Sequence, residues 1–165
     1  MDTGEELRFD RGADAPERLT RRLSRLAAMT AAQMTRTART ALRAVGAHKD
    51  HYVVLAALAE FGPASQAALA TRSHVFTSDL VAVLNDLEAG GWVRRAPDPA
   101  DRRRNVITLT EPGARRLDEL DRVLEQVDQH ILAPLDPDER AQLFALLDRV
   151  NRHLADAGTA APDTP

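Results

Sequence analysis

The feature that most constrains the fold of this chain is a change of hydrophobic period at Gly90-Gly91. Before this pair, apolar residues recur every three or four positions, which indicates amphipathic helices. After it, the short runs Trp92–Arg95 and Asn105–Leu109 are typical of strands. Between them lie Pro97 and Pro99, and we expect these prolines to keep residues 96–104 out of a β-ladder and to favour turns. The sequence therefore predicts a β-hairpin with a charged tip, placed directly after a helix.

Two short helices are predicted immediately before the hairpin. Ser65 is a suitable N-cap for a helix from Gln66 to Arg72, and Ser73–Phe76 follows as a turn. Thr77 or Ser78 is then expected to cap the next helix, which Gly90-Gly91 ends. The inward face of this helix carries Leu80, Val83, Leu84 and Leu87. Two short helices with a tight connection form a helix-turn-helix.

Helical patterns also precede this pair. One runs from about Pro16 to Val45 and ends at Gly46, although the centre of its apolar stripe is only mildly hydrophobic. A second runs from about Lys49 to Phe61 and is stopped by Gly62-Pro63.

Two further helices are predicted after the hairpin. Thr110 caps the first, whose apolar residues step by three and four in a seam suited to packing against another helix, and Pro134 ends it. Asp136-Pro137-Asp138-Glu139 then combines an N-cap, a first-turn proline and an N3 glutamate, which predicts a helix to about Leu154.

Composition sets broad limits on the class of protein. The 165 residues suit one core with helical extensions, and the N-terminal segment contains no apolar run typical of a secretion signal or a membrane span. We therefore expect a cytoplasmic protein. The absence of cysteine excludes disulfides and cysteine-ligated zinc. The net charge of −3 argues against a nucleic-acid partner, but from Arg94 to Arg104 five arginines and two aspartates give a local charge of +3.

The hairpin region carries a specific pattern. Asp-x-Arg occurs at Asp101 and Arg103, and Leu-Thr-x-x-Gly follows, ending at Gly113. Together with the helix-turn-helix before it, this stretch resembles the MarR family of bacterial transcriptional regulators. The resemblance covers roughly residues 20–155 and is best from Ser65 to Gly113. It implies a mainly α fold with a small β-hairpin wing, namely a winged helix-turn-helix with N- and C-terminal dimerisation helices.

The resemblance also implies a function and a set of DNA-binding residues. The start of the recognition helix enters the major groove, and an arginine of the wing, with Arg103 as first choice, enters the minor groove. Asp101 orients that arginine. We predict a sequence-specific transcriptional regulator that binds a pseudo-palindromic operator on double-stranded DNA. The resemblance implies that it is a repressor. The predicted DNA-binding residues are Thr77, Ser78, Asp79, Ala82, Arg72, Arg94, Arg95, Arg102, Arg103 and Arg104.

Several of these residues have simpler explanations. Asp79 either caps the helix or accepts a hydrogen bond from a cytosine, although phosphates would repel its carboxylate. Arg72, Arg94 and Arg95 are either phosphate contacts or plain surface residues. The arginines of the hairpin tip either bind DNA or make up an ordinary solvated turn.

The resemblance predicts a homodimer whose terminal helices interlock. The expected domains are a disordered tail (residues 1–15), a helical dimerisation region (16–48 and 111–156), a DNA-binding region (49–110) and a second disordered tail (157–165). The alternative is that the terminal helices fold back as a monomer core. Two copies of the recognition helix, about 34 Å apart, would reach successive major grooves on one side of DNA.

MarR-like regulators commonly bind small aromatic or anionic effectors beside their dimerisation helices. His48, His51 and Tyr52 are the candidate lining residues here; the alternative is that they are partly exposed residues at a helix start. The spacing of His48 and His51 also suits a metal, but the sequence shows no further clustered ligand, so neither a metal nor a cofactor is predicted.

The sequence contains no motif of a known catalytic site. A Gly-rich phosphate loop, H-E-x-x-H and G-x-S-x-G are all absent, and the histidines are scattered. We therefore predict that the protein is not an enzyme. The remaining rival is a winged-helix module that binds proteins rather than DNA.

Overall fold

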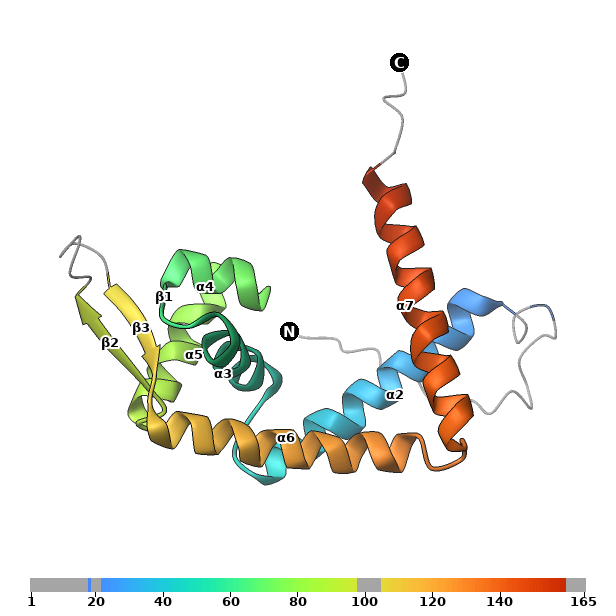
Figure 1. Cartoon of the computed structure of the whole chain (residues 1–165), viewed down its shortest axis with the longest axis horizontal. Coiled ribbons are helices and arrows are strands. Elements are labelled where there is room, and N and C mark those ends of the chain that lie inside the picture. Colours follow the sequence, from blue (N-terminus) through green and yellow to red (C-terminus); the bar gives the residue numbers. More distant parts are fainter. Residues whose placement is uncertain (1–17, 19–21, 98–104, 160–165) are drawn as a thin grey trace, which may run out of the picture. The chain divides into compact units, whose positions relative to one another are not determined.

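The computed structural model describes residue 18, residues 22–97 and residues 105–159, and its helices and hairpin strands follow one another in the order that the periodicity predicts (Figure 1). The predicted N-terminal tail, the C-terminal tail from residue 160 onward and the hairpin tip, with Asp101, Arg102, Arg103 and Arg104, lie outside these residues. Residues 157–159, predicted to belong to the C-terminal tail, instead form the end of a helix. The fold class is confirmed, because helices dominate and the sheet is small. The elements are α2 (Leu23–Ala44), α3 (Lys49–Phe61), β1 (Ala64–Ser65), α4 (Gln66–Ser73), α5 (Thr77–Ala89), β2 (Val93–Pro97), β3 (Asn105–Leu109), α6 (Glu111–Ile131) and α7 (Pro137–Thr159).

The helix-turn-helix is formed by α4 and α5, as predicted, but one cap differs. Ser65 caps α4 by accepting a hydrogen bond from the Ala68 backbone N–H at 3.3 Å. The prediction that Thr77 or Ser78 caps α5 is wrong, because Thr77 is already helical and the N-cap is Phe76. The carbonyl of this extended residue accepts from the N–H of Asp79, at 3.0 Å, so the backbone makes the turn that a side chain was expected to make. The cap alternative for Asp79 is excluded by the same geometry.

The hairpin belongs to a three-stranded antiparallel sheet in the order β1-β3-β2. The strand β1 was not predicted, since its two residues carry no alternation and form a strand only by pairing with β3. The expectation that prolines keep residues 96–104 out of the ladder is also wrong at its start. Pro97 pairs with Asn105 at the end of β2. An edge strand tolerates a proline because one side of its backbone needs no partner.

A single apolar core holds these elements together. Its fully buried side chains come from α3, α4, α5, β3 and α6, and the largest are Leu55, Leu69, Leu80, Leu84, Leu87, Ile107 and Leu120. Each such leucine contributes roughly 1.5–3 kcal/mol by leaving water. We call α3, β1, α4, α5, β2 and β3 together the winged unit.

The Leu-Thr-x-x-Gly motif has a clear structural role where the hairpin meets α6. The Thr110 hydroxyl donates to the Gly91 carbonyl at 2.7 Å and accepts from the Gly113 N–H at 3.0 Å, so it caps α6 as predicted and closes the hairpin. A Cβ at Gly113 would overlap the carbonyl oxygen of Trp92. The motif therefore requires glycine because the backbone just before β2 and the first turn of α6 approach each other closely here.

The described residues divide into two compact units after Val127, within α6. The second unit contains α7, and its predicted capping box is confirmed. The Glu139 N–H donates to Asp136 Oδ1 at 2.8 Å, and the Asp136 N–H donates to Glu139 Oε2 at 2.9 Å. Along α7 large apolar side chains remain exposed: Phe144, Leu146, Leu147, Val150 and Leu154. Among the residues that the structure describes, no helix combines the length and the hydrophobicity that a membrane span requires.

Candidate nucleic-acid interface

The first turn of α5 faces outward. Thr77, Ser78, Asp79 and Ala82 are all exposed, whereas Leu80, on the opposite side of the same turn, is fully buried. The N-terminal end of a helix also carries a partial positive charge, which attracts phosphate. The predicted DNA-binding residues at the start of α5 therefore share one exposed, sterically open helix face.

Asp79 is the acidic member of this face. Its Oδ1 accepts a hydrogen bond from the Ser78 hydroxyl at 3.1 Å. A carboxylate in the first turn is stabilised by the helix dipole. The pair leaves Asp79 at the exposed end of α5, where a direct base contact remains the prediction.

One residue at this end was missed by the sequence analysis. Phe76, treated there only as part of a turn, is 80% exposed just before α5. An exposed apolar ring beside a reading helix can contact a thymine methyl group. No sequence signal separated it from Val75, which is buried.

The predicted phosphate-contacting arginines differ in their surroundings. Arg72, exposed at the end of α4, has its guanidinium carbon 5.4 Å from the centre of the Phe61 ring, a cation–π arrangement. Arg94 is exposed on β2. Arg95, next to it and on the other face of the strand, has a side chain only 25% exposed.

Arg95 joins the hairpin to α5. One guanidinium nitrogen donates to Asn85 Oδ1 at 2.8 Å, and Nε lies 3.7 Å from Glu88 Oε2. Its backbone N–H donates to the same glutamate at 3.1 Å. These contacts favour a structural role for Arg95 and leave Arg94 as the outward-facing cation of this strand.

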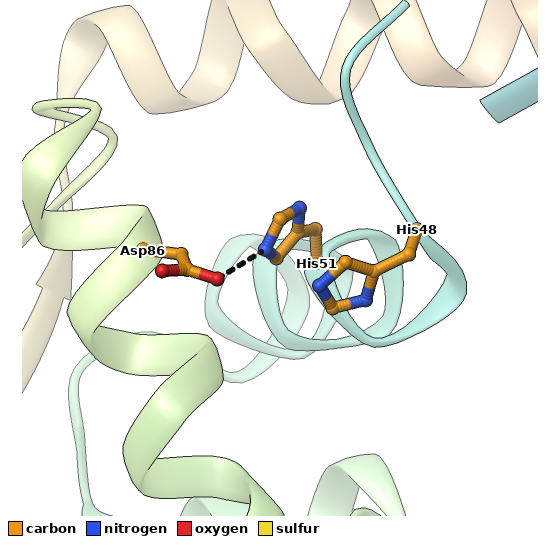
Figure 2. Close-up of side chains that lie close together, drawn as sticks. All are labelled: His48, His51 and Asp86. Carbon is orange, nitrogen blue, oxygen red and sulfur yellow. Dashed lines mark ion pairs between the residues drawn. The ribbon is translucent and has the colours of Figure 1, made fainter. Parts of the chain in front are cut away.

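The three residues predicted to line an effector pocket lie near different carboxylates: the histidines lie near Asp86, whereas Tyr52 bonds to Asp121. His48 and His51, at the start of α3, have ring centres 3.6 Å apart, and His51 Nε2 lies 3.7 Å from Asp86 Oδ2 on α5 (Figure 2). The Tyr52 hydroxyl instead donates to Asp121 Oδ1 on α6, at 2.8 Å. Asp86 was not predicted, because only the fold brings it to the histidines.

His51 is the one charged or polar side chain in the buried core of the described residues. Burial lowers the pKa of His51 below its ordinary value, and neighbouring His48 lowers it further, whereas Asp86 acts in the opposite direction. The imidazole is therefore held toward its neutral form.

Arg116 is a third residue that the sequence did not indicate, after Phe76 and Asp86. Its side chain, 14% exposed, places the guanidinium carbon 5.0 Å from the centre of the Trp92 ring and pairs with Glu119 at 3.0 Å. It also donates to the Val45 carbonyl just after α2. Arg116 thus connects the end of α2 with the base of the hairpin.

Comparison with known proteins gives a consistent result. A model described as MarR family matches residues 50–104. A protein of Thauera aromatica named as a transcriptional regulatory protein for the hcr operon is 36% identical over 70% of this chain and 69% of its own length. The transcriptional repressor NicR of Pseudomonas putida is 33% identical over 60% of this chain, which spans only 63% of that relative.

A solved structure gives the same architecture in a complex. A mutant of Escherichia coli MarR with operator DNA is 26% identical, with a TM-score of 0.65 over 78% of this chain and 92% of that one. These relatives are transcriptional regulators, which confirms the prediction that the protein is not an enzyme.

Proposed function

Because this chain belongs to the MarR family of DNA-binding transcriptional regulators, we propose that it is a homodimeric repressor that reads a pseudo-palindromic operator. The observation that carries the proposal is the outward face at the start of α5, where Thr77 and Ser78 in the first turn and Ala82 in the second are exposed. In the proposed complex these residues meet base edges in the major groove, and Asp79 accepts from a cytosine amino group.

The cationic residues supply affinity rather than sequence preference. Arg72 and Arg94 contact phosphates on either side of the reading helix, and Arg95 supports the hairpin from α5. The minor groove receives the arginines of the predicted hairpin tip, Arg102, Arg103 and Arg104, and Asp101 orients them. The DNA-binding region is then residues 49–110.

The dimer is proposed from the apolar side chains that the terminal helices leave exposed. Leu23 and Leu26 on α2, and Phe144, Leu147 and Leu154 on α7, are each at least half exposed. Stripes of this kind on long helices are typical of an interface between subunits. Residues 16–48 and 111–156 form the proposed dimerisation region.

Release of DNA by a small aromatic or anionic effector is a further part of the proposal. NicR, one of the relatives, is named as a repressor. The distance between the two recognition helices would differ between conformations of the dimer. An effector that binds one of these conformations more tightly would increase the population of that conformation. Repressor action and effector response are tested together by expression of the genes next to the bound sites.

The experiment that tests DNA binding measures affinity against salt. We would select bound fragments from the source genome and titrate one of them with protein at several salt concentrations. Steep loss of affinity with salt is expected from phosphate neutralisation. Arg72→Ala and Arg94→Ala should each reduce the slope by about one, because one phosphate is then no longer neutralised, whereas Arg122→Ala, an exposed arginine on α6, should leave it unchanged. Failure to bind any fragment at low salt would overturn the proposal and favour a protein-binding module.

A further inference from the structure

Three side chains with metal-ligating atoms meet where the start of α3 lies near the C-terminal half of α5. We propose that His48, His51 and Asp86 bind a divalent transition-metal ion of the zinc type, with one coordination position left open. Their ligand atoms lie within 4.8 Å of one another (Figure 2). The proposal concerns metal binding alone and does not depend on DNA binding.

The distances are close to those of a bound site. Zinc–nitrogen and zinc–oxygen bonds of 2.0–2.2 Å in a tetrahedron separate neighbouring ligand atoms by about 3.4 Å. His51 Nε2 and Asp86 Oδ2 are already 3.7 Å apart. Asp86 is 65% and His48 is 42% exposed, so both side chains have room to rotate toward a common ion.

The buried member of the cluster lacks hydrogen bonds at its ring nitrogens. His51 is only 6% exposed, yet neither of its ring nitrogens makes a hydrogen bond with any residue that the structure describes. A buried polar group left without a hydrogen bond costs about 1–3 kcal/mol. A metal bond to Nε2 would satisfy one of the two nitrogens.

The protonation state of the site also suits a metal. Metals bind the neutral imidazole, and the burial of His51, only 6% exposed, favours that form because a charged ring would lose its hydration. A protonated His51 paired with Asp86 is the competing arrangement, and burial disfavours it.

The donor set selects the class of metal. Two imidazoles and one carboxylate suit zinc, cobalt or nickel, whereas magnesium and calcium prefer oxygen ligands throughout. Three protein ligands leave a fourth position for water or an anion. Asp50, 3.8 Å from His48 Nδ1, is placed to accept the second N–H of that ring, as carboxylates do in metal sites.

The test uses the full-length chain without an affinity tag, freed of metal with a chelator. We would titrate it with Co²⁺, following the visible absorption bands of the bound ion, and with Zn²⁺ against a competing chelating dye. The expected result is one ion per chain, with Zn²⁺ displacing Co²⁺. His48→Ala and Asp86→Asn should each weaken binding by at least about tenfold.

The variants are chosen so that loss of folding does not confuse the result. The side chain of His48 is 42% exposed and that of Asp86 is 65% exposed, so their replacement should leave the core intact, which circular dichroism would verify. His130→Ala and His153→Ala remove exposed histidines elsewhere and should not alter affinity. The proposal is overturned if the chain binds neither ion, or if His48→Ala and Asp86→Asn bind as tightly as the parent.

Discussion

The winged unit buries large apolar side chains in a core, whereas helix α7 leaves large apolar side chains exposed. In α5, Leu80 and Leu84 are fully buried, whereas in α7 Phe144 is 60% and Leu147 is 50% exposed. Both helices have amphipathic sequences, so the pattern alone does not distinguish them. The difference shows that the core covers these leucines of the winged unit, whereas the large apolar side chains of α7 remain exposed for the proposed dimer interface.

The largest effect is expected from a cavity in the winged unit. Leu84→Ala should lower the free energy of unfolding by roughly 2–5 kcal/mol, because the surrounding core fills the space only in part. Chemical denaturation followed by circular dichroism measures this loss. If the core of the winged unit is independent of assembly, the loss measured in the dimeric state and in a dissociated variant should be the same.

A charge on α7 should act on assembly instead. Leu147→Glu should raise the dimer dissociation constant by at least about tenfold, or 1.4 kcal/mol, since a carboxylate would have to be buried in the proposed interface. Sedimentation velocity over a range of concentrations measures it. Glu139 and its neighbours keep α7 capped, so the helix content should change little. A variant that stays fully dimeric would show that this face of α7 is not the interface.

The smallest effect is expected at the start of α7. Asp136→Ala removes the side chain that accepts from the Glu139 N–H and should cost about 1 kcal/mol, within a usual range of 0.5–2 kcal/mol. Hydrogen exchange of the amides in the first turn of α7 would report the loss locally. Amides of α5 should keep their protection, and a change there would contradict the separation of the two regions.

The sequence was most informative where structure depends on neighbours along the chain. The bounds of α3, the Ser65 cap and the capping box of Asp136 and Glu139 were predicted because each needs only residues a few positions apart. The exposed first turn of α5 was predicted for the same reason, since the buried leucines of that helix show which side faces inward.

Features that depend on distant pairing could not be predicted in this way. The strand β1 exists only because β3 lies beside it, and the backbone turn at Phe76 replaces a side-chain cap without any sequence signal. Asp86 joins His48 and His51 only once α5 packs near α3. The role of Arg95 likewise required Asn85 and Glu88 to be placed by the fold.

The contacts of Arg95 have a consequence for how such a regulator would respond to a signal. Because one side chain joins β2 to α5, the hairpin and the reading helix are expected to turn together as a rigid pair. A rearrangement at the subunit contact would then alter the span between two such pairs while preserving the angle inside each one. Operator affinity would depend on that span. A small rotation of the subunits, far from the bases, would therefore change the contacts at both half-sites together.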